Sequence, residues 1–133
     1  MDGEMAIKPL PDGALLANDD YEITEVLGRG GFGITYLAKD RQLRSTVAVK
    51  EYAPADFAER APESYKLTPT DAAEFDWGLN RFREEGRTLA RFSNTPSIVS
   101  VARIFEENCT VYLVMEYIDG PNIVEFSESR TNP

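Results

Sequence analysis

The sequence predicts an α+β domain in which a five-stranded antiparallel sheet packs against one long helix. Three observations predict this fold class. Residues 21–52 contain three strand-like runs in succession, the segment after Asp71 repeats its apolar residues with helical spacing, and residues 99–117 contain two more strand-like runs joined by a tight turn. A chain of 133 residues is long enough to bury one such core.

Alternation and β-branched residues define the first three strands. The run from Tyr21 reads YEITEVLG, the run from Gly33 reads GITYLAKD, and residues 46–52 read TVAVKEY before Pro54. Alternate side chains of such runs face the same side of a pleated strand. Residues 1–20 hold prolines and glycines without periodicity, so we expect them to form a leader that packs loosely.

A long connection and the helix follow. Residues 54–69 mix prolines with charges, and we expect an irregular connection with room for one helical turn at AERA. Asp71 and Glu74 have the spacing of a helix-start box, and the helix is expected to end near residues 92–94, before Pro96. One stripe of this helix is apolar and comprises Phe75, Leu79, Phe82, Gly86 and Leu89.

The last two strands are predicted at residues 99–106 and 110–117, with the turn between them at residues 107–109. The Asp-Gly-Pro sequence at residues 119–121 ends the second of these strands. A strand that stops abruptly beside a cleft leaves backbone N–H and C=O groups unpaired. Such groups suit the edge of adenine, although a plain last strand followed by a turn has the same pattern.

Composition excludes several classes of function. The chain has no histidine, which excludes a Ser–His triad and a His-ligated metal site, and its one cysteine, Cys109, excludes an internal disulfide and favours a reducing cytoplasmic setting. A net charge of −9 argues against nucleic acid or an anionic membrane surface as a partner. No apolar run approaches membrane-spanning length, and residues 1–14 lack the pattern of a signal peptide.

The glycine pattern Gly28-x-Gly30-x-x-Gly33 is shared by several nucleotide-binding folds. A dinucleotide fold requires a helix directly after the glycines, but the segment after Gly33 alternates like a strand. A P-loop requires Gly-Lys-Ser/Thr, but Ile34 follows Gly33. The remaining interpretations are a hairpin that folds over phosphates, with Phe32 at its tip, and an ordinary glycine-rich hairpin.

Ala48 and Lys50 are two residues apart and therefore point to the same face of their strand. A lysine on the inner face of a sheet needs a carboxylate partner, because an unpaired desolvated charge is costly. At about 100° per residue, Glu85 lies roughly 60° from Phe82 on the edge of the apolar stripe, whereas Glu84 points toward solvent. Glu85 is therefore the predicted partner of Lys50.

Taken together, these segments resemble the small lobe of eukaryotic-like Ser/Thr protein kinases, particularly bacterial ones. The matching segments are LGRGGFGITYLA (27–38), VAVK (47–50), RFREE (81–85), TPSIV (95–99) and VYLVMEYIDG (111–120). Their order and spacing match over about 100 of the 133 residues. The resemblance divides the chain into a leader (1–20), an ATP-binding small lobe (21–120) and the exit toward a large lobe (121–133).

The resemblance also implies roles for individual residues. Lys50, paired with Glu85, would hold the α- and β-phosphates of ATP as the catalytic pair. The turn over the phosphates would comprise Gly28, Arg29, Gly30, Gly31, Phe32, Gly33 and Ile34. The adenosine would contact Leu27, Thr35, Ala48, the gatekeeper Met115, the backbone of Glu116 and Ile118, and Asn122.

The chain also departs from the pattern of this family. Thr35 and Thr95 replace the usual Val and His, and residues 53–73 make the connection before the helix unusually long. Neither a His-Arg-Asp catalytic loop nor an Asp-Phe-Gly triplet occurs in the 133 residues. The Mg²⁺ ligands and the substrate-orienting base of a complete kinase are therefore absent, and we expect no phosphoryl transfer to a protein substrate by this chain alone.

The alternative to part of an active kinase is a stand-alone nucleotide-binding or regulatory module of pseudokinase type. Such a module would use the surface that faces the large lobe in a kinase for self-association or for another partner.

Overall fold

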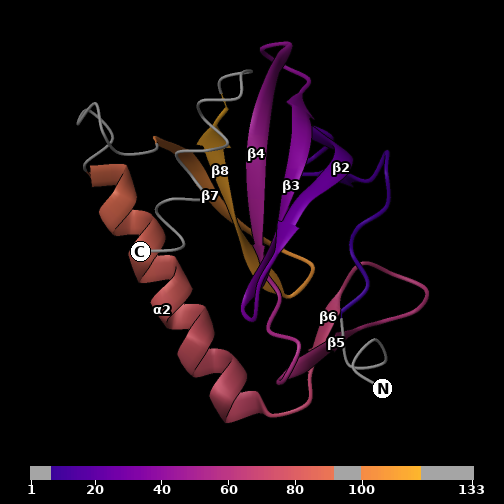
Figure 1. Cartoon of the computed structure of the whole chain (residues 1–133), viewed down its shortest axis with the longest axis vertical. Helices are drawn as coiled ribbons and strands as arrows, with labels where there is room; N and C mark the ends of the chain where they lie inside the picture. Colours follow the sequence, from indigo (N-terminus) through magenta and orange to yellow (C-terminus); the bar gives the residue numbers. More distant parts are fainter. Residues whose placement is uncertain (1–6, 92–99, 118–133) are drawn as a thin grey trace.

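The structure, a computed structural model, describes residues 7–91 and 100–117. Figure 1 shows a twisted sheet with one long helix along its side and a small hairpin beyond its lower end. In chain order the elements are β1 (Leu15–Leu16), β2 (Tyr21–Arg29), β3 (Gly33–Asp40), β4 (Ser45–Tyr52), β5 (Ala58–Arg60), β6 (Leu67–Pro69), α2 (Ala72–Arg91), β7 (Val101–Glu107) and β8 (Thr110–Glu116). No helix in these two ranges is long and apolar enough to cross a membrane.

The main sheet has the strand order β1-β2-β3-β4-β8-β7, and all neighbouring strands are antiparallel. The five predicted strands are β2, β3, β4, β7 and β8, so the α+β fold class is confirmed. The sixth strand was not predicted: it is the short β1, in which Leu15 pairs with Glu22 and Leu16 with Tyr21. The predicted tight turn between β7 and β8 is confirmed, with Asn108 and Cys109 at φ of 54° and 62°.

The expectation of a loosely packed leader is wrong for residues 7–16. Ile7, Leu10, Ala14 and Leu16 are each at most 3% exposed and belong to the main core. The backbone N–H of Leu10 donates a hydrogen bond to the Tyr36 hydroxyl at 3.0 Å. Apart from the two residues of β1, the leader buries apolar side chains from an irregular backbone, so it leaves no periodic pattern in the sequence.

The connection between β4 and the helix forms the β5–β6 hairpin instead of a helical turn. Ala58 pairs with Pro69 and Arg60 with Leu67, so the AERA stretch is extended. The Leu67 N–H also donates to the carbonyl of Asn108 at 2.9 Å, which joins the hairpin to the β7–β8 turn. Pairing between two short segments satisfies the backbone groups that an isolated helical turn would leave unsatisfied.

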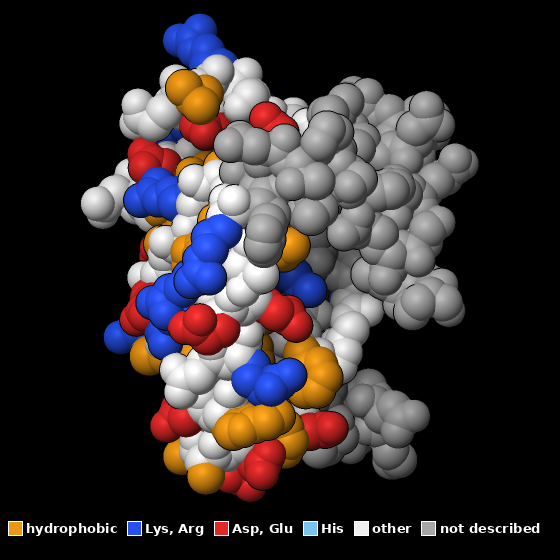
Figure 2. Space-filling view, turned by 90° about the vertical axis from the view of Figure 1, so that its left-hand side faces the viewer, with side chains coloured by type: hydrophobic (Ala, Val, Ile, Leu, Met, Phe, Trp, Pro, Cys, Tyr) orange, Lys and Arg blue, Asp and Glu red, His pale blue; other side chains and the backbone are white. Residues whose placement is uncertain are grey.

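Helix α2 begins at the predicted cap, where the Asp71 carboxylate accepts a hydrogen bond from the Glu74 N–H at 3.2 Å. The predicted stripe faces the sheet, with Phe75, Phe82 and Gly86 buried. A Cβ atom on Gly86 would lie 2.5 Å from Cδ2 of Leu113, so the glycine lets the helix approach β8 closely. Figure 2 shows charges of both signs on the opposite, outer side of the molecule.

Candidate functional site

One face of the central strands carries four of the predicted site residues. Thr35 lies opposite Lys50, and Ala48 lies opposite Met115 in the strand register. Residues directly opposite each other in antiparallel strands share a face, and Ala48 and Lys50 share one because they are two apart. The structure therefore brings Thr35, Ala48, Lys50 and Met115 to one face of the sheet.

The side chain of Ile34 lies on the other face. Ile34 pairs with Glu51 and is 2% exposed, within the core that also contains Tyr36. Successive side chains of a strand alternate between its two faces, so Ile34 lies on the face opposite to that of Thr35 and Lys50. Only the backbone of Ile34 can therefore contribute to the turn that precedes it.

The glycine turn is held at two points. The Gly30 N–H donates to the Gly33 carbonyl, and the Ala53 N–H donates to the Phe32 carbonyl, each at 2.9 Å. A Cβ atom on Gly33 would lie 2.5 Å from the Glu51 carbonyl oxygen, so only glycine allows this approach to β4. The Phe32 side chain at the tip is 64% exposed.

The other glycines of the turn have open space beside them. Hypothetical Cβ atoms on Gly28, Gly30 and Gly31 would meet no atom within 4 Å. Leu27, just before the turn, is 41% exposed. The backbone of the turn thus has open space beside three of its glycines, which suits the close approach of a ligand as large as a polyphosphate.

The predicted ion pair between Lys50 and Glu85 is not formed in this structure. Within residues 7–91 and 100–117, no carboxylate oxygen lies within 4.0 Å of the Lys50 Nζ. The ammonium lies 5.9 Å from the ring centroid of Phe82, while Glu85 is exposed. Helix α2 presents Phe82, not the next turn with Glu85, to the lysine.

Glu84 points to solvent, as the stripe predicts, and its carboxylate pairs with Arg87 at 2.6 Å. Both side chains of this pair are more than half exposed, so it contributes little to stability. Of the two neighbouring glutamates, neither is buried against the sheet.

A buried cluster of polar side chains lies behind Lys50 and was not predicted from the sequence. The carboxylate of Glu51, with a side-chain exposure of 0%, accepts hydrogen bonds from Tyr36, Tyr112 and Arg60. The signal was available: Glu51 continues the alternation of Val47 and Val49, which are apolar and buried. A carboxylate in register with buried valines requires buried donors elsewhere in the chain.

In this cluster the charged Arg60–Glu51 pair lies between the neutral hydroxyls of two tyrosines. Burial lowers the pKa of Arg60, but the hydrogen bonds and charge of Glu51 outweigh burial and raise it. Burial and the negative charge of Glu51 both raise the pKa of Tyr36 and that of Tyr112. Both tyrosines therefore remain protonated and donate to the carboxylate.

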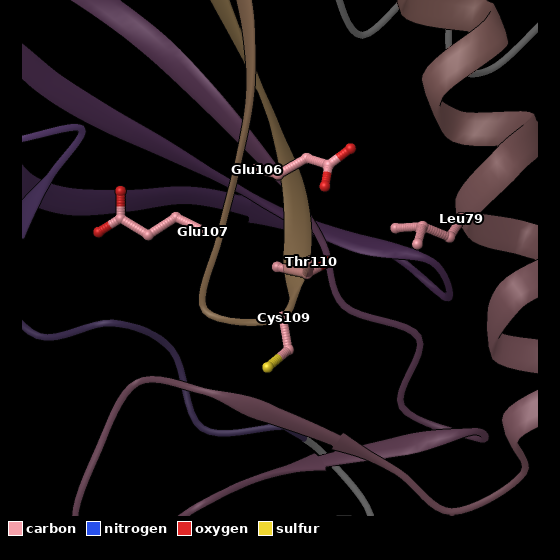
Figure 3. A pocket seen from close by; sticks show the side chains of 5 residues that line it. All are labelled: Leu79, Glu106, Glu107, Cys109 and Thr110. Atoms are coloured by element: carbon pink, nitrogen blue, oxygen red, sulfur yellow. The ribbon is translucent and has the colours of Figure 1, made fainter.

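A shallow hollow at the β7–β8 turn does not suit a phosphate. It is lined by Leu79, Glu106, Glu107, Cys109 and Thr110 (Figure 3), none of which is basic. Figure 3 shows the Glu106 carboxylate directed toward the helix side and that of Glu107 directed away from it. Two acidic side chains beside the hollow would repel an anion.

Part of the predicted adenosine contact lies outside the described residues. Ile118 and Asn122 belong to that part. Glu116 is the last residue of β8, and its N–H donates to the Ser100 carbonyl at 3.0 Å.

Comparisons with known proteins identify the family to which the sequence is similar. The sequence profile described as protein kinase domain matches residues 21–132. The chain is 31% identical over 112 residues to serine/threonine-protein kinase B, and 32% identical over 120 residues to serine/threonine-protein kinase C, both of Synechocystis sp. (strain ATCC 27184 / PCC 6803 / Kazusa). These matches cover 83% and 88% of this chain but 17% and 20% of those proteins.

A more distant relative and a solved structure extend the comparison. Rho-associated protein kinase 1 of Homo sapiens is 29% identical over 115 residues, which are 86% of this chain and 7% of that protein. The solved structure described as the PpkA-294 apo form superposes with a TM-score of 0.77 at 40% identity, over 84% of this chain and 40% of that one. The chain thus spans a fifth or less of the curated relatives named here.

Proposed function

The chain belongs to the protein kinase domain family, and from this premise we propose that residues 21–120 form the ATP-binding small lobe of a protein serine/threonine kinase. The observation that carries the proposal is the shared face of Thr35, Ala48 and Lys50. At one end of this face, the glycine turn is hydrogen-bonded to Ala53, the residue that follows β4. The small Ala48 leaves room for a flat base. Lys50 supplies the cation that a phosphate requires.

In this proposal each part of the site has one task. Backbone N–H groups of the turn from Gly28 to Gly33, other than the Gly30 N–H that donates to Gly33, bind phosphate oxygens, and Lys50 neutralises the α- and β-phosphates. Leu27, Thr35 and Ala48 contact the base, and Met115 limits the depth of the adenine site. Glu85 becomes the partner of Lys50 in the complete enzyme, which requires helix α2 to turn or shift so that the carboxylate replaces the Phe82 ring.

Mg²⁺ accompanies ATP in kinases of the type that the sequence resembles. Within the described ranges, no three histidine, cysteine, aspartate or glutamate side chains gather into a metal site. The 133 residues also lack a histidine and an Asp-Phe-Gly triplet, and we propose that on their own they bind ATP without transferring its phosphoryl group.

The 133-residue chain is expected to bind ATP at least about tenfold more tightly than adenosine, because charge-assisted hydrogen bonds are each worth about 1.5–3 kcal/mol. Adenosine retains the base contacts and loses every contact with Lys50 and the glycine turn. Competition against a fluorescent ATP analogue at fixed ionic strength measures both dissociation constants. Equal affinities for ATP and adenosine would mean that no phosphate site exists here.

A further inference from the structure

The buried carboxylate of Glu51 lies directly behind the proposed phosphate site. Glu51 follows Lys50 in β4, so their side chains leave opposite faces of the same strand. Its two carboxylate oxygens accept from the hydroxyls of Tyr36 and Tyr112, each at 2.7 Å, and from two nitrogens of Arg60, at 2.8 and 2.9 Å. The segment of β4 that carries Lys50 is therefore fixed from its far side.

Arg60 joins three segments that are distant in sequence. Besides the Glu51 carboxylate, its guanidinium donates to the carbonyl of Lys8 in the leader and to the carbonyl of Tyr65 in the β5–β6 hairpin, each at 2.8 Å. The Arg60 side chain is 6% exposed. A planar group with five donors is suited to hold a carboxylate and two carbonyls at once.

The glycine turn is bonded to the residue before Lys8 and to a residue of the connection that leads into the hairpin. The carbonyl of Ile7, next to Lys8, accepts a hydrogen bond from the Arg29 side chain at the start of the turn. The N–H of Ala53, which begins the connection to the hairpin, donates to the carbonyl of Phe32 at the tip. The start and the tip of the turn are thus bonded to the leader and to the connection that leads into the hairpin of Arg60.

We propose that Arg60 is a positioning residue for nucleotide binding, which acts by holding the leader and the hairpin connection against the glycine turn. This inference rests on the proposed function of the turn. Inside the turn the Gly30 N–H donates to the Gly33 carbonyl, and Gly28, Gly30 and Gly31 have open space beside them. The contacts of the turn with other segments, at Arg29 and Phe32, therefore help to set its position. An anchored turn presents its N–H groups to phosphates at a smaller entropic cost than a free one.

The test compares Arg60→Lys with Tyr112→Phe in the 133-residue chain. Arg60→Lys keeps a positive charge beside Glu51 but lacks the fork that reaches the Lys8 and Tyr65 carbonyls. Tyr112→Phe removes one hydrogen bond from the same carboxylate and the bond that the hydroxyl accepts from the Asn108 side chain, but no bond of Arg60 to the Lys8 and Tyr65 carbonyls. Arg60→Lys is expected to raise the ATP dissociation constant at least about threefold through loss of preorganisation, and Tyr112→Phe to leave it within measurement error.

Amide hydrogen exchange separates positioning from a general loss of stability. Arg60→Lys is expected to accelerate exchange of the Ala53 N–H relative to the amides of β8, whereas Tyr112→Phe is not. ATP affinities that change equally in the two variants, or in neither, overturn the proposal. So does Ala53 exchange that changes only in proportion to global stability.

A second variant covers the case in which Arg60→Lys does not fold. A chain that begins at Pro9 lacks the Ile7 and Lys8 carbonyls but keeps the Arg60–Glu51 pair, and it is also expected to bind ATP at least about threefold more weakly. Unchanged affinity in this shortened chain contradicts the proposal. If the wild-type chain itself binds no ATP, the proposed function fails first; if the wild type binds and all variants bind equally, only the positioning role fails.

Discussion

Replacement of Arg60 by methionine is expected to lower the free energy of unfolding by about 3–5 kcal/mol, the usual cost of leaving one charge of a buried pair without its partner. Glu51 is fully buried and would keep only the two tyrosine hydroxyls as donors. The Lys8 and Tyr65 carbonyls would also lose their donor. Urea denaturation followed by circular dichroism measures the change.

The matched control is Arg83→Met. Arg83 also forms a short ion pair with a glutamate, at 2.7 Å, but its partner Glu106 is 68% exposed. Water replaces the lost partner there, so the expected cost is below about 1 kcal/mol. Similar losses in the two variants would show that burial of Glu51 does not determine the strength of its pairing.

Replacement of Lys50 by methionine is expected to raise the ATP dissociation constant at least about tenfold, which corresponds to the loss of about 1.4 kcal/mol or more of binding free energy. In the proposed site, Lys50 is the basic side chain assigned to the phosphates. Its removal should not unfold the chain: Lys50 forms no ion pair among the described residues, and methionine retains the contact with Phe82. Titration with ATP and thermal unfolding of the same samples separate the two effects.

Lys39→Met provides the charge-matched control for this substitution. Lys39 lies on the same face of β3 as Thr35 but near the opposite end of the strand, where it pairs with Thr46. The same net charge is lost, so general electrostatic attraction of ATP changes equally in both variants. Equal weakening of ATP binding by the two substitutions would argue against a specific role of Lys50.

The strands and the helix could be predicted because their signals are local. Alternation over GITYLAKD and the stripe from Phe75 to Gly86 each reflect burial of one side of a regular element. The leader and the β5–β6 hairpin could not be predicted in this way. Leu10 and Leu67 are buried by contacts with distant segments, and neither lies in a periodic run.

The same difference between local and long-range signals applies to the candidate site. The shared face of Ala48 and Lys50 follows from the two-residue period of one strand and appears in the structure. The partner of Lys50 depends instead on how helix α2 sits on the sheet, which the close packing of Gly86 against Leu113 helps to set. Helical spacing places Glu85 near the edge of the buried stripe but does not fix its distance from β4.

ATP is proposed to bind at one site, the face of Lys50 beneath the glycine turn. Backbone-amide NMR during titration with ATP tests it most directly, because each amide reports its own surroundings. The largest shifts are expected in residues 28–33 and 48–50, with small ones in the β5–β6 hairpin. Shifts that concentrate around Cys109 or on the outer side of helix α2, while residues 28–33 stay unchanged, would contradict the account.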